Sequence, residues 1–108
     1  MDKKSLIIAE FSIVPVGSGE TSVGRYVAAA INALKNAKGL EYEVTTMGTV
    51  LAADNLDTIF GAVRQAHEAV MAKGVKRVVS TLRIDDRRDK ARTMDDKVKA
   101  VERYMKEP

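Results

Sequence analysis

The amino-acid sequence predicts an α+β fold, because strand-like and helix-like segments alternate along a chain of 108 residues. Period-two alternation of apolar side chains marks strands at residues 6–14, 41–47, 49–53 and 75–84. Apolar stripes at helical spacing mark residues 22–38 and 54–74, and a last helix follows Thr93. The order β-α-β-β-α-β with an added C-terminal helix is the ferredoxin-like plan. We therefore expect one domain, residues 1–108, with an antiparallel sheet, its first strand between the third and fourth, and both main helices on one face.

The first strand and first helix are delimited by turn-forming residues. Pro15 and the glycine-rich segment after it are expected to end the strand. Ser22 is expected to be the N-cap of the helix, and Gly39 its stop signal. The residues expected to face the helices are Ile7, Ala9, Phe11 and Ile13.

The second half carries equally local signals. Gly48 marks a tight connection between the two middle strands, and Asp54 or Asn55 is the expected N-cap of the second helix. Gly61 inside that helix costs roughly 1 kcal/mol relative to alanine, which predicts a close helix contact there. His67 beside the apolar stripe is expected to be a hydrogen-bonded core histidine. Thr93 with Asp96 three residues later predicts a capping box for the last helix.

The sheet face away from the helices should be open and of mixed polarity. On the last strand the more apolar set, which includes Ser80 and Leu82, should face the helices, so Thr81 and Arg83 face outward. The outward set on the first strand is Ile8, Glu10, Ser12 and Val14. The middle strands are expected to add Thr45, Met47, Thr49 and Leu51 to this face. Such a surface predicts packing against a second subunit's sheet, with a small polar cavity left between the two sheets.

Composition excludes several functional classes. The absence of cysteine excludes disulfides and thiolate metal sites, and a single histidine argues against a transition-metal site. The net charge of +3 comes from interspersed charges, unlike a nucleic-acid footprint. The apolar stretch near the N-terminus is too short to span a membrane, so we expect a cytoplasmic protein.

Catalysis is also disfavoured by the residue pattern. No nucleophile–histidine–acid set is evident, because the single histidine lies on a helix stripe. The first loop lacks the arginine that acylphosphatases of this fold use, and the asparagines lie on or beside helices. We therefore expect no enzyme activity and no cofactor. The charged run 83–92 is expected to be a turn held by local ion pairs, although its four arginines could also bind an acidic partner.

Two sets of residues resemble a known family. They are Ile13-Val14-Pro15 with Ser22 and residues 26–29, and residues 46–49 with the run 81–89. Together these motifs resemble the small one-domain thiamine-binding-protein family, which is YkoF-related. The resemblance implies a ferredoxin-like domain assembled as a homotetramer, a dimer of dimers, without established catalytic activity. It also implies a ligand of the thiamine or hydroxymethylpyrimidine type.

The candidate ligand-binding residues combine the open face with this resemblance. The Glu10 carboxylate could accept a hydrogen bond from an aminopyrimidine or balance a thiazolium charge, and it could equally pair with Arg83. The hydroxyl-bearing residues are also good strand residues, so each taken singly has a structural explanation. Ser22 lies at a helix start, where free amides favour anions such as a vitamer phosphate. The full set is Glu10, Ser12, Ser22, Thr46, Thr49, Thr81 and Arg83.

The sequence thus predicts a non-catalytic small-molecule-binding protein whose ligand lies between the sheets of a homo-oligomer. One alternative is a structural or regulatory oligomerisation module that binds no ligand. Another is an amino-acid sensor, which would require a loop-borne site at a subunit edge.

Overall fold

The computed structural model describes residues 5–107 and confirms the predicted α+β, ferredoxin-like architecture. The strands are β1 (Ile7–Val16), β2 (Glu41–Val44), β3 (Thr49–Ala53) and β4 (Arg77–Asp86). The helices are α1 (Gly24–Leu34), α2 (Leu56–Met71) and α3 (Met94–Met105). All pairings in the sheet are antiparallel, in the order β2-β3-β1-β4, so β1 lies between β3 and β4 as predicted.

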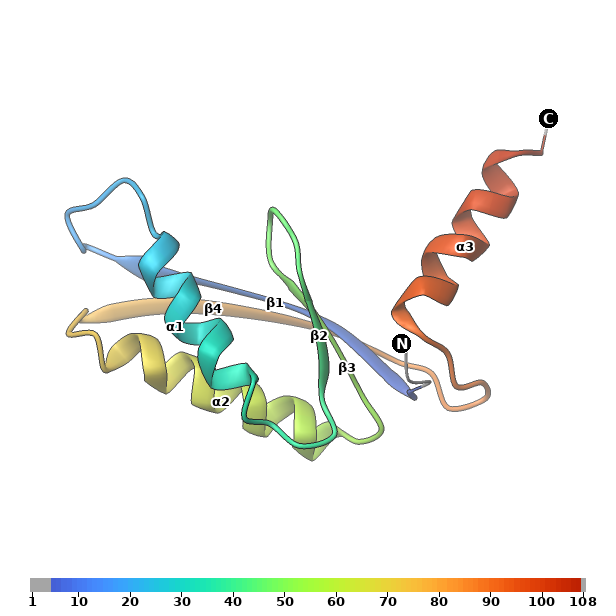
Figure 1. Cartoon of the computed structure of the whole chain (residues 1–108), viewed down its shortest axis with the longest axis horizontal. Coiled ribbons are helices and arrows are strands. Elements are labelled where there is room, and N and C mark those ends of the chain that lie inside the picture. The colour runs from blue at the N-terminus through green and yellow to red at the C-terminus, as the bar shows by residue number, and fades with distance from the viewer. Residues whose placement is uncertain (1–4, 108) are drawn as a thin grey trace.

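The hydrophobic core lies between the sheet and two of the three helices. Helices α1 and α2 pack side by side over one face of the sheet, whereas α3 projects away from the rest of the molecule (Figure 1). The core contains Ile7, Ala9, Phe11, Ile13, Tyr26, Ala30, Leu34, Leu51, Ala53, Ile59, Ala62, Ala66 and Val70. No residue of α3 is buried, so this helix adds nothing to the core of the protomer.

Strand β1 is paired unequally on its two edges. All ten of its residues pair with β4, but only Ile7 to Phe11 pair with β3. Pro15 was expected to end the strand, and that expectation is wrong, because β1 continues to Val16. Proline is tolerated here since β1 has a partner on one side only, so one of its edges needs no ladder donors. The second half of β1 therefore has a free edge.

The side-chain alternation predicted for β1 and β4 is confirmed, and that for β3 is wrong. Glu10 pairs with Arg83, and Ser12 pairs with Thr81, on the face away from α1 and α2. Thr49 and Leu51, however, are buried on the helix side, because they pair with Phe11 and Ala9. In this register Val50 and Ala52 take the open-face positions. Thr45 and Met47 lie in the β2–β3 turn instead of in a strand.

The ends of α1 differ from the sequence prediction, and the N-terminal caps of α2 and α3 agree with it. Helix α1 ends at Leu34 instead of continuing to residue 38. Ser22 is not the N-cap of α1: the cap position is Val23, which makes no side-chain hydrogen bond. The N-cap of α2 is Asn55, whose side chain accepts a hydrogen bond from the Thr58 amide. The capping box of Thr93 and Asp96 at α3 is confirmed.

Two further expectations concern α2. His67 is half-buried, and its Nδ1 lies 2.7 Å from the Ser80 hydroxyl, as expected for a core histidine bonded across to the sheet. The close helix contact predicted at Gly61 is wrong, because a Cβ built there meets no heavy atom within 4 Å. Gly61 instead lies on the exposed side of α2.

Candidate functional site

The free edge of β1 borders a cavity of about 290 Å³, which we call the edge pocket. One wall is the N-terminal part of α1, the opposite wall is the β2–β3 turn, and the floor is the second half of β1. Its lining residues are Phe11, Ser12, Ile13, Val14, Val23, Val27, Ala30, Ile31, Val44, Thr45, Thr46, Met47, Gly48 and Thr49. The pocket exists because β3 pairs with only the first half of β1 and leaves the space beyond Phe11 to side chains.

The lining of the edge pocket is apolar with a few neutral polar groups. Aliphatic side chains of α1 and the ring of Phe11 supply most of the wall, while Ser12, Thr45, Thr46 and Thr49 add hydroxyls. The unpaired edge of β1 at residues 12–14 adds main-chain donors and acceptors that β3 does not use. None of the lining residues is ionisable. This combination suits a flat, largely apolar ring that carries a few hydrogen-bonding groups.

The β2–β3 turn is held tightly against β1. The carbonyl of Gly48 accepts hydrogen bonds from both the amide and the hydroxyl of Thr45, each at 2.8 Å. A Cβ on Gly48 would lie 3.0 Å from the carbonyl oxygen of Phe11 and 3.6 Å from Cγ of Glu10. Gly48 therefore permits a close backbone approach that closes the pocket, and it lies beside the Glu10 side chain.

The structure divides the predicted site residues between two cavities and leaves two of them outside both. Ser12, Thr46 and Thr49 line the edge pocket, so three members of the predicted set do meet, although Thr49 reaches it from the helix side of the sheet. Glu10 and Arg83 line a different depression of about 250 Å³ on the open face. Ser22 and Thr81 line neither cavity and are exposed.

The open-face depression is shallow and charged. Glu10 and Arg83 are direct neighbours in the β1–β4 register, yet no ion pair joins them in the part of the chain that the structure describes. Ile8 and Val50 form its apolar part, and Lys97 of α3 borders it. Both charged side chains remain available to a ligand or to another subunit.

Sequence reasoning missed the contribution of α1 to the edge pocket. In the sequence the contributing residues form the apolar stripe of a helix, a pattern that core residues share. They are Val23, Val27, Ala30 and Ile31. Pro15 was the available signal, since proline inside a strand indicates an unpaired edge. That edge is the floor of the pocket.

The charged run 83–92, predicted to be a turn, is one only in its second part, because residues 83–86 complete β4. The predicted local ion pairs are present. Arg87 pairs with Asp89 at 2.7 Å, and Arg88 pairs with Asp86 at 2.8 Å. The hydrogen bond from Arg87 lowers the pKa of the Asp89 carboxyl, and the bond from Arg88 likewise lowers the pKa of Asp86. These pairs are exposed, so they order the turn without contributing much stability.

Two features of residues 5–107 bear on the predicted class of protein. Neither α1, α2 nor α3 is long and apolar enough to cross a membrane. The same residues contain no group of three or more histidine, cysteine, aspartate or glutamate side chains arranged to hold a metal ion.

Comparison with known proteins identifies the family. The model of the thiamine-binding protein family matches residues 9–102, which include most of β1, the edge pocket, β4 and most of α3. The chain belongs to the thiamine-binding protein family. The family therefore agrees with the resemblance carried by the strand-end and turn motifs of the sequence.

Relatives cover nearly the whole chain. A UPF0045 protein of Methanothermobacter thermautotrophicus is 49% identical over 96 residues, which are 89% of this chain and 96% of the relative. The crystal structure of a hypothetical protein from Methanocaldococcus jannaschii matches with a TM-score of 0.79 and 45% identity, covering 88% of this chain and 94% of that one. A Thermotoga maritima protein proposed to act in thiamine biosynthesis or salvage shares the fold, with a TM-score of 0.69 at 21% identity, over 88% of this chain and 97% of its own.

Proposed function

We propose that the protein is a non-catalytic binding protein for thiamine or its hydroxymethylpyrimidine moiety, and that the aminopyrimidine ring occupies the edge pocket. The observation that carries the proposal is the chemistry of that pocket in a chain of the thiamine-binding protein family. Apolar side chains can enclose the ring faces, and hydroxyls and free main-chain groups can bond the ring nitrogens and the amine. A volume of about 290 Å³ suits one ring system better than a larger ligand.

The pocket also distinguishes the two halves of thiamine. A permanent positive charge in an apolar pocket without an ionisable residue would lose its hydration uncompensated. The thiazolium therefore lies outside, and the Glu10 carboxylate next to Gly48 is the anionic group within reach of the pocket mouth. In this arrangement Ser12, Thr46 and Thr49 bind the ring, whereas Glu10 balances the charge.

We further propose that the protein is a cytoplasmic homo-oligomer, a dimer of dimers that buries the open sheet face. Val14 and Val79 are 48% and 47% exposed on that face, which also carries the unpaired charges of Glu10 and Arg83. Helix α3 carries a second exposed apolar stripe, formed by Val98, Val101, Tyr104 and Met105. Surfaces of this kind are typical of contacts between subunits. Ser22, Thr81 and Arg83 then act at or near subunit contacts, within reach of the ligand's distal end.

A matched pair of threonine variants tests where the ligand binds. Thr49→Val removes a hydroxyl from the edge pocket, and Thr81→Val makes the same change on the open face outside it. Calorimetric titration with thiamine and with hydroxymethylpyrimidine should show affinity lowered about tenfold by Thr49→Val and unchanged by Thr81→Val. Glu10→Ala should weaken thiamine but not hydroxymethylpyrimidine, because only thiamine carries the cationic ring.

Opposite results reject different parts of the proposal. No heat with either ligand at millimolar concentration removes the binding function and leaves an oligomerisation module. If Thr81→Val lowers the affinity and Thr49→Val does not, the ligand binds on the open face between the sheets of two subunits and not in the edge pocket. Light scattering that finds a monomer at micromolar concentration removes the assembly. A thermal-shift panel of amino acids tests the sensor alternative.

A further inference from the structure

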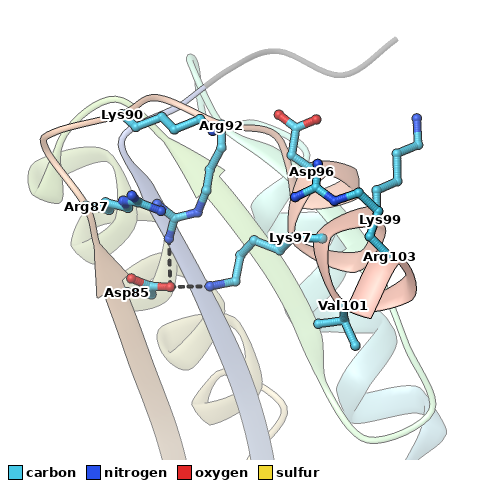
Figure 2. Close-up of a pocket in the computed structure, with 10 residues that line it drawn as sticks. Asp85, Arg87, Lys90, Arg92, Asp96, Lys97, Lys99, Val101 and Arg103 are labelled. Atoms are coloured by element: carbon cyan, nitrogen blue, oxygen red, sulfur yellow. Dashed lines mark hydrogen bonds and ion pairs between the residues drawn. The ribbon is translucent and has the colours of Figure 1, made fainter. Parts of the chain in front are cut away.

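A further cavity differs from the edge pocket in its lining, which is rich in cationic side chains. It occupies about 540 Å³ between the end of β4, the loop that follows, and α3 (Figure 2). Six cationic and two acidic side chains line it. Asp89 and Asp95, outside the lining, pair with Arg87 and Lys99, so six cations face four carboxylates and the local excess is two positive charges. The cationic members are Arg87, Lys90, Arg92, Lys97, Lys99 and Arg103. We call it the cationic cavity.

Arg92 is the anchor of this cavity. Its main chain is fixed by two hydrogen bonds with Ser5, at 2.9 and 3.0 Å, and its side chain is only 7% exposed. One guanidinium nitrogen, Nη2, lies 2.7 Å from the Asp85 carboxylate. The other, Nη1, is buried and has no hydrogen-bond acceptor among residues 5–107. A buried charged donor without an acceptor is costly, so this atom is an unusual feature of the fold.

Asp85 holds two cations of the cavity, Arg92 and Lys97, and its single charge balances only one of them. Figure 2 shows the side chains of Arg92 and Lys97 converging on its carboxylate, one from the loop and one from α3. The hydrogen bond from Lys97, and then that from Arg92, hold the pKa of Asp85 below its usual range. A single carboxylate thus holds two cations in place. Lys90 and Arg103 also line the cavity and make no ion pair with any described residue.

From these observations we infer that the cationic cavity is a binding site for a multiply charged oxyanion, the phosphate or diphosphate group of a small phosphorylated molecule. Arg92 contributes a guanidinium charge that its main chain and Asp85 hold in place. Its Nη1 is buried, so the contacts with phosphate oxygens fall to the exposed cations of the cavity. Lys90 and Arg103 supply charge at the rim. The inference does not rest on binding in the edge pocket, because the cationic cavity and the edge pocket share no lining residue. Asp85 and Lys97 also border the open-face depression.

An anion in this cavity has a structural consequence for α3. The ion pair of Lys97 with Asp85 links this helix to the end of β4. An oxyanion bound by Lys90 of the loop and by Arg103 of α3 adds a second link between them. Binding to the folded state therefore slows the opening of α3, in addition to any effect on overall stability.

The experiment titrates the full-length protein with inorganic pyrophosphate, inorganic phosphate and phenyl phosphate in a calorimeter, at fixed ionic strength. The expected result is saturable binding that is tightest for pyrophosphate. The double variant Lys90→Met/Arg103→Met removes two exposed cations of the cavity. The matched control, Lys38→Met/Lys73→Met, removes two exposed lysines from other loops and so has the same net charge. The cavity variant should bind pyrophosphate about tenfold more weakly, and the control should bind as the wild type does.

Hydrogen exchange separates site binding from general charge screening. Pyrophosphate should slow exchange of the α3 amides, and sodium chloride at equal ionic strength should not. Arg92→Met should abolish the effect. If that variant does not fold because Arg92 is buried, the Lys90→Met/Arg103→Met variant decides. Equal weakening in cavity and control variants, or no binding by the wild type at millimolar pyrophosphate, overturns the inference. Tight binding of phenyl phosphate indicates a phosphate ester as ligand, and a preference for the inorganic ions indicates free phosphate or pyrophosphate.

Discussion

The substitution Gly48→Ala should destabilise the protein and disturb the edge pocket together. Its new Cβ would lie 3.0 Å from the Phe11 carbonyl oxygen, a contact tighter than nearly all that real Cβ atoms make. The oxygen cannot move away, because Phe11 is paired with Thr49 on one side and Leu82 on the other. The turn cannot move freely either, since Gly48 accepts two hydrogen bonds from Thr45. The substitution therefore strains the contact between residue 48 and the Phe11 carbonyl, which closes the edge pocket.

The expected magnitude follows from two opposing terms. Forcing a methyl group into a packed backbone contact costs about 1–3 kcal/mol. Replacing glycine also restricts the unfolded chain, which offsets about 0.4–1 kcal/mol of that cost. The net loss lies between roughly 0 and 2.6 kcal/mol, centred near 1 kcal/mol, and each kcal/mol lowers Tm by about 4–8 °C for a domain of this size.

Gly61→Ala is the matched control, because it makes the same chemical change where a Cβ meets nothing within 4 Å. Alanine inside an exposed helix position is favoured over glycine by about 0.8–1 kcal/mol, so this variant should be more stable than the wild type. Urea denaturation of both variants should give shifts of opposite sign, and thiamine affinity should fall only in Gly48→Ala. A Gly48→Ala protein as stable as the wild type would refute the close-approach argument. A destabilised Gly61→Ala protein would refute the assignment of Gly61 to an open helix surface.

Two further predictions concern α3. Thr93→Ala removes the capping box and should destabilise the helix by about 1 kcal/mol, which hydrogen exchange of the α3 amides would detect and unchanged exchange would contradict. Acid should release α3 from β4, because the lowered pKa of Asp85 makes its contribution fully present above the ordinary aspartate pKa of about 4 and lost as pH falls through the lower folded-state value. Protection of the α3 amides, measured relative to their intrinsic exchange rates at each pH, should fall in that window in the wild type and not in Asp85→Asn, in which the carboxylate is already absent.

Most of the fold was predictable because its signals are local. The strand and helix periodicities, the Asn55 cap and the Thr93 capping box each depend on a few neighbouring residues, and all are observed. The register of the β2–β3 hairpin was not predictable. A shift of one residue moves every side chain of a strand to the other face, and nothing in the sequence of Thr49 or Leu51 fixes which face that is.

The candidate site was only partly predictable for the same reason. Glu10 and Arg83 were placed correctly, since the apolar sets on β1 and β4 leave only one arrangement that buries them. Their grouping with Thr49 was wrong, because it depended on the hairpin register. The cationic cavity was hidden in a run that reads as alternating charges. The excess of cationic over acidic side chains arises in the folded chain, where α3 places Lys97, Lys99 and Arg103 beside the loop.

The unequal pairing of β1 explains why a binding pocket can exist in so small a sheet. Strand β3 has five residues, so it pairs with β1 only as far as Phe11, and the turn at Gly48 reverses the chain at that point. A longer hairpin would extend the ladder and fill the edge pocket with main chain. An unpaired strand edge usually invites another chain to pair with it, but Pro15 interrupts its donors and α1 covers it from one side. The remaining main-chain groups are thus shielded from strand pairing while still open to a ligand the size of a single ring.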